Sequence, residues 1–393
     1  MAFDLSAAPS DTVRFATFNA ALNRNTSGEL IADLTTADNA QAQAVAEIIQ
    51  RTAPDVLLIN EFDFDPNGLA VELFQRNYLG RSQNGAAAID YPYVFVAPSN
   101  TGLASGFDLD NDGDTTGPGD NYGFGLFPGQ FGMVLLSKYP IENTQARTFQ
   151  NFRWKDMPGA LLPDDPTSDA PLDWYSSAEL EAVRLSSKSH WDVPIRIHNR
   201  IVHVLASHPT PPVFDGTEDR NGLRNHDEIR FWADYISPLR SRYVYDDSGK
   251  RGGLRPGASF VVMGDLNADP FDGDSTGRPA WLLLNHPKIN TRKTPASEGG
   301  PDAAARQGEI NALQLADSAF DTADFADGTP GNLRVDYVLP SYQLKTHRAG
   351  VFWPTENNPL FDLVGEYPFP SSDHRLVWVD VRPKLGWHER ATD

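Results

Sequence analysis

Several apolar segments of this sequence end in a carboxylate, an amide or an imidazole. The fold must either bring these polar side chains together in one place or bury each of them separately. The segment VVMGDLN places Asp265 and Asn267 directly after an apolar run, and Asp269-Pro270 follow. Taken alone, this ending is explained by turn chemistry, because turns favour Asp, Asn, Gly and Pro. Turn chemistry does not explain why the same ending recurs along the chain. The other polar groups at such ends are Asn19, Glu61, His208, Asp336, Asp373 and His374.

Predicted strands and helices alternate along the chain, which is typical of an α/β protein. Strands are predicted at 12–19, 54–62, 91–98, 131–140, 193–208, 259–267, 333–341 and 374–381. Helices are predicted at 38–52, with Asp38 as the N-cap, at 68–79 and at 220–241.

The predicted strands pair in both directions. Residues 193–208 are typical of a hairpin that turns at His198-Asn199, and some other gaps between strands are too short for a crossover helix. Because parallel neighbours need such a crossover, we expect mixed pairing. We therefore predict an α/β fold of two mixed sheets packed face to face with helices outside, in one domain spanning 1–393. An acidic Gly- and Asp-rich insertion at 98–130 interrupts it.

The charge balance limits which partners the chain can bind. Its 393 residues carry a formal net charge of −20, and no basic patch is visible in the sequence. Broad electrostatic attraction to a phosphate backbone is therefore excluded, and a phosphate-containing partner needs a local cation such as a bound divalent metal. The chain has no cysteine, which excludes disulfides, thiolate metal sites and a cysteine nucleophile.

No apolar run approaches the roughly 20 residues needed to cross a bilayer. The first residues, MAFDLSAAPSDT, have no basic start and no long apolar stretch, so we predict no signal peptide there. The compartment stays open, and an extracellular location is expected only if a signal peptide was removed. We expect a monomer.

In α/β proteins, ligand sites lie where strand ends converge, so we expect the polar groups at these ends to form one site. Carboxylates with neighbouring amides suit a hard cation such as Mg²⁺. Histidines and further carboxylates can transfer protons or stabilise charge. The sequence has no G-x-x-x-x-G-K-[ST], so no P-loop competes with this interpretation.

The ordered motifs TFN, INE, SHP, GDLNADP, VDYVL and SSDH resemble those of the endonuclease/exonuclease/phosphatase superfamily. Its members include deoxyribonuclease I, abasic-site endonucleases, sphingomyelinases and inositol polyphosphate 5-phosphatases. The resemblance spans residues 13–381, and GDLNADP and SDH are its specific parts. It implies a four-layer α/β/β/α sandwich like that of deoxyribonuclease I, which agrees with the two sheets predicted above. It also implies Mg²⁺ or Mn²⁺ at the catalytic site.

The resemblance implies roles for the residues on the metal side of such a site. Glu61 would be the main ligand of the metal, with Asn19 beside it and Asp373 nearby. Asp265 would orient or deprotonate the attacking water, and Asn267 would hold the phosphate.

The resemblance also implies roles for the remaining strand-end residues. His374 would contact the scissile phosphate, and Asp336 would orient its ring. His208 matches a position that is histidine in deoxyribonuclease I, which favours a phosphodiester substrate. Two questions stay open from the sequence: which group is the general base, and which carboxylate pairs with His208.

Four further residues are candidates for substrate binding. Lys188 and His190 precede a predicted strand, and in the inositol phosphatase relatives a lysine near this point touches phosphate. The alternative for both is a solvated strand edge. Arg224 and Asn225 lie in the first turns of a predicted helix, where backbone amides and the helix dipole favour anions. The alternative there is a capped helix with surface charges.

The acidic insertion contains a candidate calcium loop. Asp108, Asp110, Asp112 and Asp114 reproduce the D-x-D-x-D-G-D start of an EF-hand loop, whose alternating oxygen ligands suit Ca²⁺. Gly119 stands where position twelve is usually acidic, and no helix pair flanks the segment. We therefore predict a structural calcium loop that is not an EF-hand, and the alternative is a disordered acidic loop.

These observations predict a metal-dependent hydrolase that cleaves a phosphodiester or a phosphomonoester by direct attack of water. Its substrate stays open between nucleic acid, a phospholipid head group and a small phosphorylated metabolite, although the net charge of −20 argues against tight duplex binding. The alternative is a catalytically silent, calcium-binding interaction module with the same fold. The intact set of matched catalytic positions disfavours that alternative.

Overall fold

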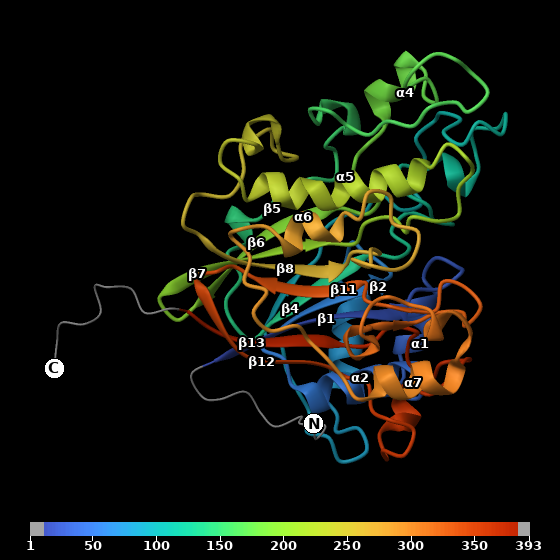
Figure 1. The fold of residues 1–393 in the computed structure, drawn as a ribbon. Helices are drawn as coiled ribbons and strands as arrows, with labels where there is room; N and C mark the ends of the chain where they lie inside the picture. The colour runs from blue at the N-terminus through green and yellow to red at the C-terminus, as the bar shows by residue number, and fades with distance from the viewer. Residues whose placement is uncertain (1–11, 384–393) are drawn as a thin grey trace.

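Two mixed β-sheets pack face to face in the computed structural model, which describes residues 12–383 (Figure 1). The larger sheet has the strand order β12 (Leu344–Val351), β13 (Val377–Pro383), β1 (Val13–Leu22), β2 (Val56–Phe62), β4 (Met133–Ser137), β3 (Tyr93–Phe95). The smaller sheet has the order β11 (Asp336–Pro340), β8 (Ser259–Asp265), β7 (Arg200–Ser207), β6 (His190–Ile197), β5 (Arg147–Thr148). A separate ribbon pairs β9 (Ala323–Asp324) with β10 (Asn332–Leu333).

Helices cover the outer face of each sheet, so the molecule has the predicted four layers (Figure 1). Beyond the larger sheet lie α1 (Glu29–Leu34), α2 (Ala40–Thr52), α7 (Gly299–Gln307), and α3 (Leu69–Phe74) with its π-helical continuation Gln75–Leu79. Beyond the smaller sheet lie α5 (Arg220–Tyr235) and α6 (Ala280–Leu284), with α4 (Ser177–Ala182) further out. Short 3₁₀ turns occupy 118–120, 143–145, 154–156, 241–243, 309–312, 318–320 and 361–363.

The central strands of the smaller sheet bury both of their faces. In β8, Val261 and Met263 belong to the hydrophobic core between the sheets, whereas Phe260 and Val262 belong to a second core beneath α5. Side chains of a strand alternate between its two faces, so two covered faces require an uninterrupted apolar run. Burial of both faces explains why β8 stays apolar until its polar end at Asp265.

Strand pairing is mixed in both sheets, as predicted. β1 and β2 are parallel, and so are β7 and β8, whereas the other neighbouring strands are antiparallel. β6 and β7 form the predicted hairpin, with His198 at its turn in a left-handed conformation, φ +52°. β1 packs against β8 across the interface between the sheets, so the two parallel pairs lie against each other at the centre of the fold.

Two helix boundaries differ from the sequence-based expectation. The N-cap of α2 is Asn39 instead of Asp38, because Asn39 Oδ1 accepts a hydrogen bond from the amide of Ala42 at 3.0 Å. The helix predicted to reach residue 241 ends at Tyr235, because Pro238 lacks an amide hydrogen and cannot continue it.

Strand boundaries near the C-terminus also differ. The segment predicted as one strand at 333–341 forms parts of β10 and β11, and the last strand begins at Val377 instead of residue 374. The sequence pattern does not predict β12. This strand lies at the edge of its sheet and exposes Lys345, so its sequence LKTHRAGV lacks the apolar run of a buried strand.

Among the described residues, no helix combines the length and the apolar character needed to cross a bilayer. The expectation about a signal peptide falls on residues 1–11, which lie outside the described residues.

Candidate active site

The polar strand ends meet at one edge of the two sheets. β1 and β2 run parallel with Asn19 beside Asn60, so Asn19 and Glu61 emerge from neighbouring strand ends. β8 and β11 run antiparallel with Asp265 directly opposite Asp336. Since β1 packs against both β8 and β11, the fold places these two pairs beside each other.

Asn19 joins the two sheets at this edge. Its Nδ2 donates hydrogen bonds to Glu61 Oε1 and to Asp265 Oδ2, each at 3.0 Å. Glu61 also accepts a hydrogen bond on Oε2 from Asn23 Nδ2 at 2.8 Å. The sequence pattern gives no signal for Asn23, which follows the end of the apolar strand. Two carboxylates therefore share the single neutral amide of Asn19.

Two of the strand-end residues adopt a left-handed backbone conformation. The φ angle is +58° at Glu61 and +51° at Asn267. At Asn267 the turn is stabilised because its amide donates a hydrogen bond to Asp265 Oδ1 at 2.9 Å. Asparagine tolerates this conformation, whereas glutamate is strained in it, and strain of this kind is concentrated at functional sites. The backbone of Glu61 therefore supports a functional role for its carboxylate.

The glycine of the GDLN motif permits a close strand contact next to the site. Gly264 has a φ of +149°, and a Cβ at this position would lie 1.9 Å from the carbonyl oxygen of Ser207 on β7. Any side chain here would force β8 away from β7. The position of Asp265, the next residue, thus depends on glycine at 264.

Glu61, Asn19 and Asp373 have the donor chemistry of a divalent cation site. Burial raises the pKa of Glu61; the hydrogen bond from Asn19 opposes this shift, and the carboxylate of Asp373 adds to it. A buried carboxylate beside a second one requires compensating positive charge, and oxygen donors match Mg²⁺ or Mn²⁺. The residues present therefore fit the metal that the motifs imply.

Asp336 and His374 form a buried hydrogen-bonded pair. His374 Nδ1 lies 2.8 Å from Asp336 Oδ2, which also accepts a hydrogen bond from Thr322 Oγ1 at 2.9 Å. Burial acts to lower the pKa of His374, but the carboxylates of Asp336 and Asp265 outweigh it and raise that pKa well above its usual value. His374 is therefore an imidazolium whose orientation Asp336 sets.

The other nitrogen of this imidazolium lies near Asp265. His374 Nε2 is 3.7 Å from Asp265 Oδ2. Burial raises the pKa of Asp265 to about 6, against the opposing charge of His374. Ligand atoms of Asp265, Asp336 and His374 lie within 4.8 Å of one another. A protonated imidazole has no lone pair to offer a metal, so in this protonation state the three residues have the donors and acceptors that proton transfer requires.

His208 is buried beside the same carboxylate but stays neutral. Its Nε2 lies 3.4 Å from Asp265 Oδ2. Burial lowers its pKa well below the usual value, and the charges of Lys188 and His374 lower it further. Among the described residues, His208 Nδ1 has no hydrogen-bond partner, so the nearest carboxylate contact of the ring is the one between Nε2 and Asp265.

Lys188 lies beside the metal side of the site. It is 7% exposed, and its Nζ approaches the carbonyl oxygen of Pro209 at 3.4 Å. Its charge lowers the pKa of Glu61 and of His208. Burial in turn lowers the pKa of Lys188 itself, although Glu228 and Glu61 oppose this shift. The structure thus brings Lys188 to the site.

His190 does not reach the site, which corrects its assignment as a substrate-binding residue. Its Nδ1 lies 2.6 Å from Ser186 Oγ, and its Nε2 lies 2.9 Å from the carbonyl oxygen of Glu228. Its ring packs against Phe231 and Trp232 of α5. Burial lowers the pKa of His190 to about 4, so it is a neutral core residue.

The guanidinium of Arg224 forms hydrogen bonds with the protein backbone. It donates hydrogen bonds to the carbonyl oxygens of Leu185, Arg184 and Tyr122, at 2.9, 2.9 and 2.5 Å. These bonds hold the segment before Lys188 against the acidic insertion. Its assignment as a substrate-binding residue is therefore corrected to that of a loop anchor.

Asn225 is fully buried and connects two loops of the site. Its Nδ2 donates hydrogen bonds to the carbonyl oxygens of Thr210 and Leu266, at 2.8 and 2.9 Å. Thr210 follows His208, and Leu266 precedes Asn267. Asn225 therefore holds two loops of the site together through their backbone carbonyl groups. Its assignment as a substrate-binding residue is likewise corrected.

The acidic insertion brings together a different set of carboxylates from the predicted one. Ligand atoms of Asp108, Asp110 and Asp120 lie within 4.8 Å of one another. Asp112 and Asp114 instead accept hydrogen bonds from amides of their own loop, Asp112 from Asp114 at 2.8 Å and Asp114 from Thr115 at 2.6 Å. The structure thus groups Asp108 and Asp110 with Asp120 and leaves Asp112 and Asp114 outside this group, and calcium binding by the loop stays a prediction.

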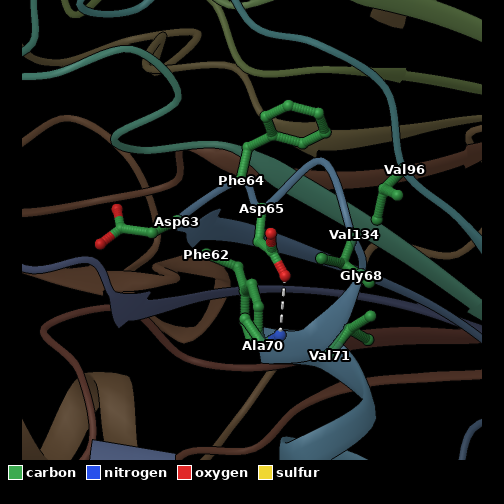
Figure 2. Close-up of a pocket in the computed structure, with 9 residues that line it drawn as sticks. All are labelled: Phe62, Asp63, Phe64, Asp65, Gly68, Ala70, Val71, Val96 and Val134. Carbon is green, nitrogen blue, oxygen red and sulfur yellow. Dashed lines mark hydrogen bonds between the residues drawn. The ribbon is translucent and has the colours of Figure 1, made fainter. Parts of the chain in front are cut away.

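A small cavity beside the end of β2 lies outside this site. Figure 2 shows that apolar side chains, including Phe62 and Val71, line it, and that Asp63 points away from them. Asp63 instead accepts hydrogen bonds from the amides of Arg24 and Phe131, at 2.8 and 3.2 Å. Burial raises the pKa of Asp63 to about 7. The cavity is a gap in apolar packing without groups that could bind phosphate.

Comparison with protein families gives one match. The model of the Endonuclease/Exonuclease/phosphatase family matches residues 16–374. This range covers most of the chain and contains every strand-end residue described above.

Several solved structures resemble this chain. An endonuclease/exonuclease/phosphatase from Beutenbergia cavernae has 18% identity and a TM-score of 0.48, covering 95% of this chain and 72% of its own. Sphingomyelinase C from Streptomyces griseocarneus has 15% identity and a TM-score of 0.46, covering 94% and 99%. Beta toxin from Staphylococcus aureus, in a structure with bound magnesium ions, has 13% identity and a TM-score of 0.43, covering 95% and 100%. No curated protein matches the sequence.

Proposed function

Because this chain belongs to the Endonuclease/Exonuclease/phosphatase family, we propose that it is a divalent-metal-dependent phosphoesterase that cleaves a phosphate ester by direct attack of water. One observation carries the proposal. A single hydrogen-bonded chain of side chains, from Glu61 through Asn19 to Asp265, joins oxygen donors suited to a metal with an Asp336–His374 pair suited to proton transfer.

Glu61, Asn19 and Asp373 would hold the metal, which when bound neutralises charge that develops on the phosphate. Asp265 would orient the attacking water and accept its proton. Its raised pKa of about 6 suits a base that works near neutral pH. Asn19 fixes the Asp265 carboxylate by the hydrogen bond at 3.0 Å.

His374 would stabilise negative charge on the phosphate in the transition state. Its proton is retained near neutral pH because Asp336 and Asp265 raise its pKa. The hydrogen bond to Asp336 at 2.8 Å leaves Nε2 as the nitrogen that can face the substrate. Charge that is positioned in this way before the reaction acts more strongly in the transition state than in the ground state.

Lys188 and Asn267 would bind the phosphate oxygens. Lys188 has three N–H donors, and only the contact with Pro209 at 3.4 Å occupies one of them within the described residues. The neutral His208 beside it adds no positive charge. We propose a phosphodiester as the substrate, since a diester carries one negative charge fewer than a monoester in this acidic surrounding.

The proposal is tested by hydrolysis assays with Mg²⁺, Mn²⁺, Ca²⁺ or EDTA. The diester substrates are bis-p-nitrophenyl phosphate, plasmid DNA, RNA and phosphatidylcholine vesicles, and the monoester substrates are p-nitrophenyl phosphate and inositol phosphates. We expect at least one diester to be cleaved with Mg²⁺ or Mn²⁺ and none in EDTA. Full activity in EDTA would refute the metal role, and no cleavage under any condition would favour the catalytically silent module.

A further inference from the structure

Helix α5 covers the outer face of the smaller sheet (Figure 1). Its residue Glu228 is only 1% exposed and lies in the middle of the helix. Burying a carboxylate costs folding free energy unless several hydrogen-bond donors compensate for the lost water. The donors that surround Glu228 therefore indicate which parts of the structure it connects.

The carboxylate of Glu228 links two separate loops. Its Oε1 accepts hydrogen bonds from the amide and the hydroxyl of Ser187, at 2.7 and 3.1 Å. Its Oε2 accepts a hydrogen bond from the amide of Thr210 at 2.7 Å. Each oxygen therefore holds one loop, and both loops are held by backbone groups.

These two loops contain residues assigned above to the site. Ser187 is adjacent to Lys188, and Thr210 is two residues after His208. The loops also touch each other, since Ser187 Oγ donates to the carbonyl oxygen of His208 at 3.3 Å. The hydrogen bonds of Glu228 to both loops therefore help to fix the distance between the ammonium of Lys188 and the imidazole of His208.

We propose that Glu228 is a positioning residue that fixes Lys188 against the 208–210 segment and thereby sets the phosphate-binding side of the site. This inference rests on the proposed function, because it concerns how tightly the substrate is held. Glu228 acts through Lys188 and does not itself contact the substrate.

The chemistry of Glu228 requires two acceptor oxygens. The variant Glu228→Gln keeps the size of the side chain but replaces one acceptor oxygen by an NH₂ group. That NH₂ group faces an amide N–H of Ser187 or Thr210, so two donors meet and one loop is released. The substitution therefore tests the bridge without removing the packing volume.

The neighbouring residue Asp227 provides a matched control. It is also fully buried on α5, and its Oδ2 accepts hydrogen bonds from Trp154 Nε1 and the amide of Leu161, both at 2.7 Å. These partners belong to neither loop of the site. The variant Asp227→Asn thus removes comparable buried hydrogen bonds from the same helix.

Steady-state kinetics with bis-p-nitrophenyl phosphate give the first readout. We expect Glu228→Gln to raise KM about tenfold while kcat changes less than threefold, because a displaced Lys188 weakens binding of substrate and transition state alike. Asp227→Asn should lower the melting temperature without raising KM. An equal rise of KM in both variants would overturn the proposal, since general destabilisation would then explain it.

A double-mutant cycle with Lys188→Met tests the route of the effect. If Glu228 acts through Lys188, adding Glu228→Gln to Lys188→Met should raise KM less than twofold further. Additive effects would mean that Glu228 acts by another route and would overturn the proposal.

Hydrogen exchange separates this inference from the proposed function. The amides of Ser187 and Thr210 should be protected in the unsubstituted protein, and at least one should lose protection in Glu228→Gln but not in Asp227→Asn. This measurement needs no activity, so it remains informative if no phosphodiester is cleaved. Unchanged protection of both amides in Glu228→Gln would show that the bridge is absent.

Discussion

The side-chain amide of Asn19 on β1 donates a hydrogen bond to Asp265 Oδ2 on β8 at 3.0 Å, so one side chain joins the two sheets at the candidate site. The same Nδ2 also donates to Glu61 at 3.0 Å. The residues proposed to hold the metal and the residue proposed to act on water are thus connected directly.

Charge is distributed unevenly around this junction. The carboxylate of Asp373 acts on Glu61 with like charge, whereas His374 and Lys188 act on it with opposite charge. A bound divalent cation would relieve the repulsion between the carboxylates, which is why metal binding should stabilise the fold as well as support catalysis.

Substitution of Glu61 should separate metal binding from folding. Glu61→Gln keeps the shape of the side chain but removes the negative charge that Mg²⁺ prefers. Because burial raises the pKa of Glu61, the uncharged side chain should also fold at least as stably in EDTA. We expect titration calorimetry to show weaker Mg²⁺ binding and thermal melting in EDTA to show no loss of stability. Unchanged Mg²⁺ affinity would contradict the assignment of Glu61 as the main ligand.

Substitution of His374 should affect the rate more than substrate affinity. His374→Ala removes a charge proposed to act in the transition state, so kcat should fall by about 10²–10⁴-fold with little change in KM. Asp336→Asn should show a smaller loss of the same kind, because the pKa of His374 falls when its partner carboxylate is removed. A variant His374→Ala that keeps kcat within about threefold, or changes KM alone, would disprove this role.

The elements that position the site were the most predictable from the sequence. In β8 and β2 both faces are covered, so their apolar runs are uninterrupted and their polar ends stand out. By contrast, β12 exposes part of its surface and has no such run. The signal for a strand therefore comes from burial, and it weakens at the edge of a sheet.

Residues that hold the loops of the site in place through hydrogen bonds to their backbone were not predictable in the same way. Glu228 is an acidic residue in a helix, and its sequence context is that of a surface charge. The positions of Arg224 and Asn225 in the first turns of a helix favour binding of an anionic substrate, and the sequence does not tell that both side chains are bonded to backbone carbonyl groups instead. Asp120 joins Asp110 only because the loop between them folds back, which no regular spacing predicts.

The buried His190 should make stability depend on pH. Burial lowers its pKa in the folded state to about 4 from the ordinary value of 6.5, so between these two pH values the unfolded chain binds more protons than the folded one. Stability should therefore rise with pH across this window and be lost as pH falls, by about 3 kcal/mol in total. We expect urea unfolding to show that His190→Gln loses about 2 kcal/mol less than the unsubstituted protein between pH 7 and pH 5. Equal losses in both proteins would show that His190 does not titrate in this way.

The acidic loop should respond to calcium through Asp110 and Asp120. Asp110 Oδ1 is buried without a hydrogen-bond partner in the described structure, and burial together with the charge of Asp120 raises the pKa of Asp110. Ca²⁺ would relieve this repulsion and stabilise the folded state by RT ln(1 + [L]/Kd), about 2.7 kcal/mol at a hundredfold excess over Kd. For a chain of this size, that corresponds to a rise in melting temperature of roughly a few degrees.

The matched variants within this loop distinguish a calcium site from a general effect of charge. Asp110→Asn combined with Asp120→Asn should abolish the Ca²⁺-dependent rise in melting temperature. Asp114→Asn should keep the rise, because Asp114 lies outside the group of Asp108, Asp110 and Asp120, and its Oδ1 accepts hydrogen bonds from the amide of Thr115 and the hydroxyl of Thr116, at 2.6 and 2.9 Å. The double variant should retain hydrolysis in Mg²⁺, since the loop is predicted to be structural. If Asp114→Asn abolished the rise and the double variant preserved it, the ligands would be those of the EF-hand pattern instead of the group observed in the structure.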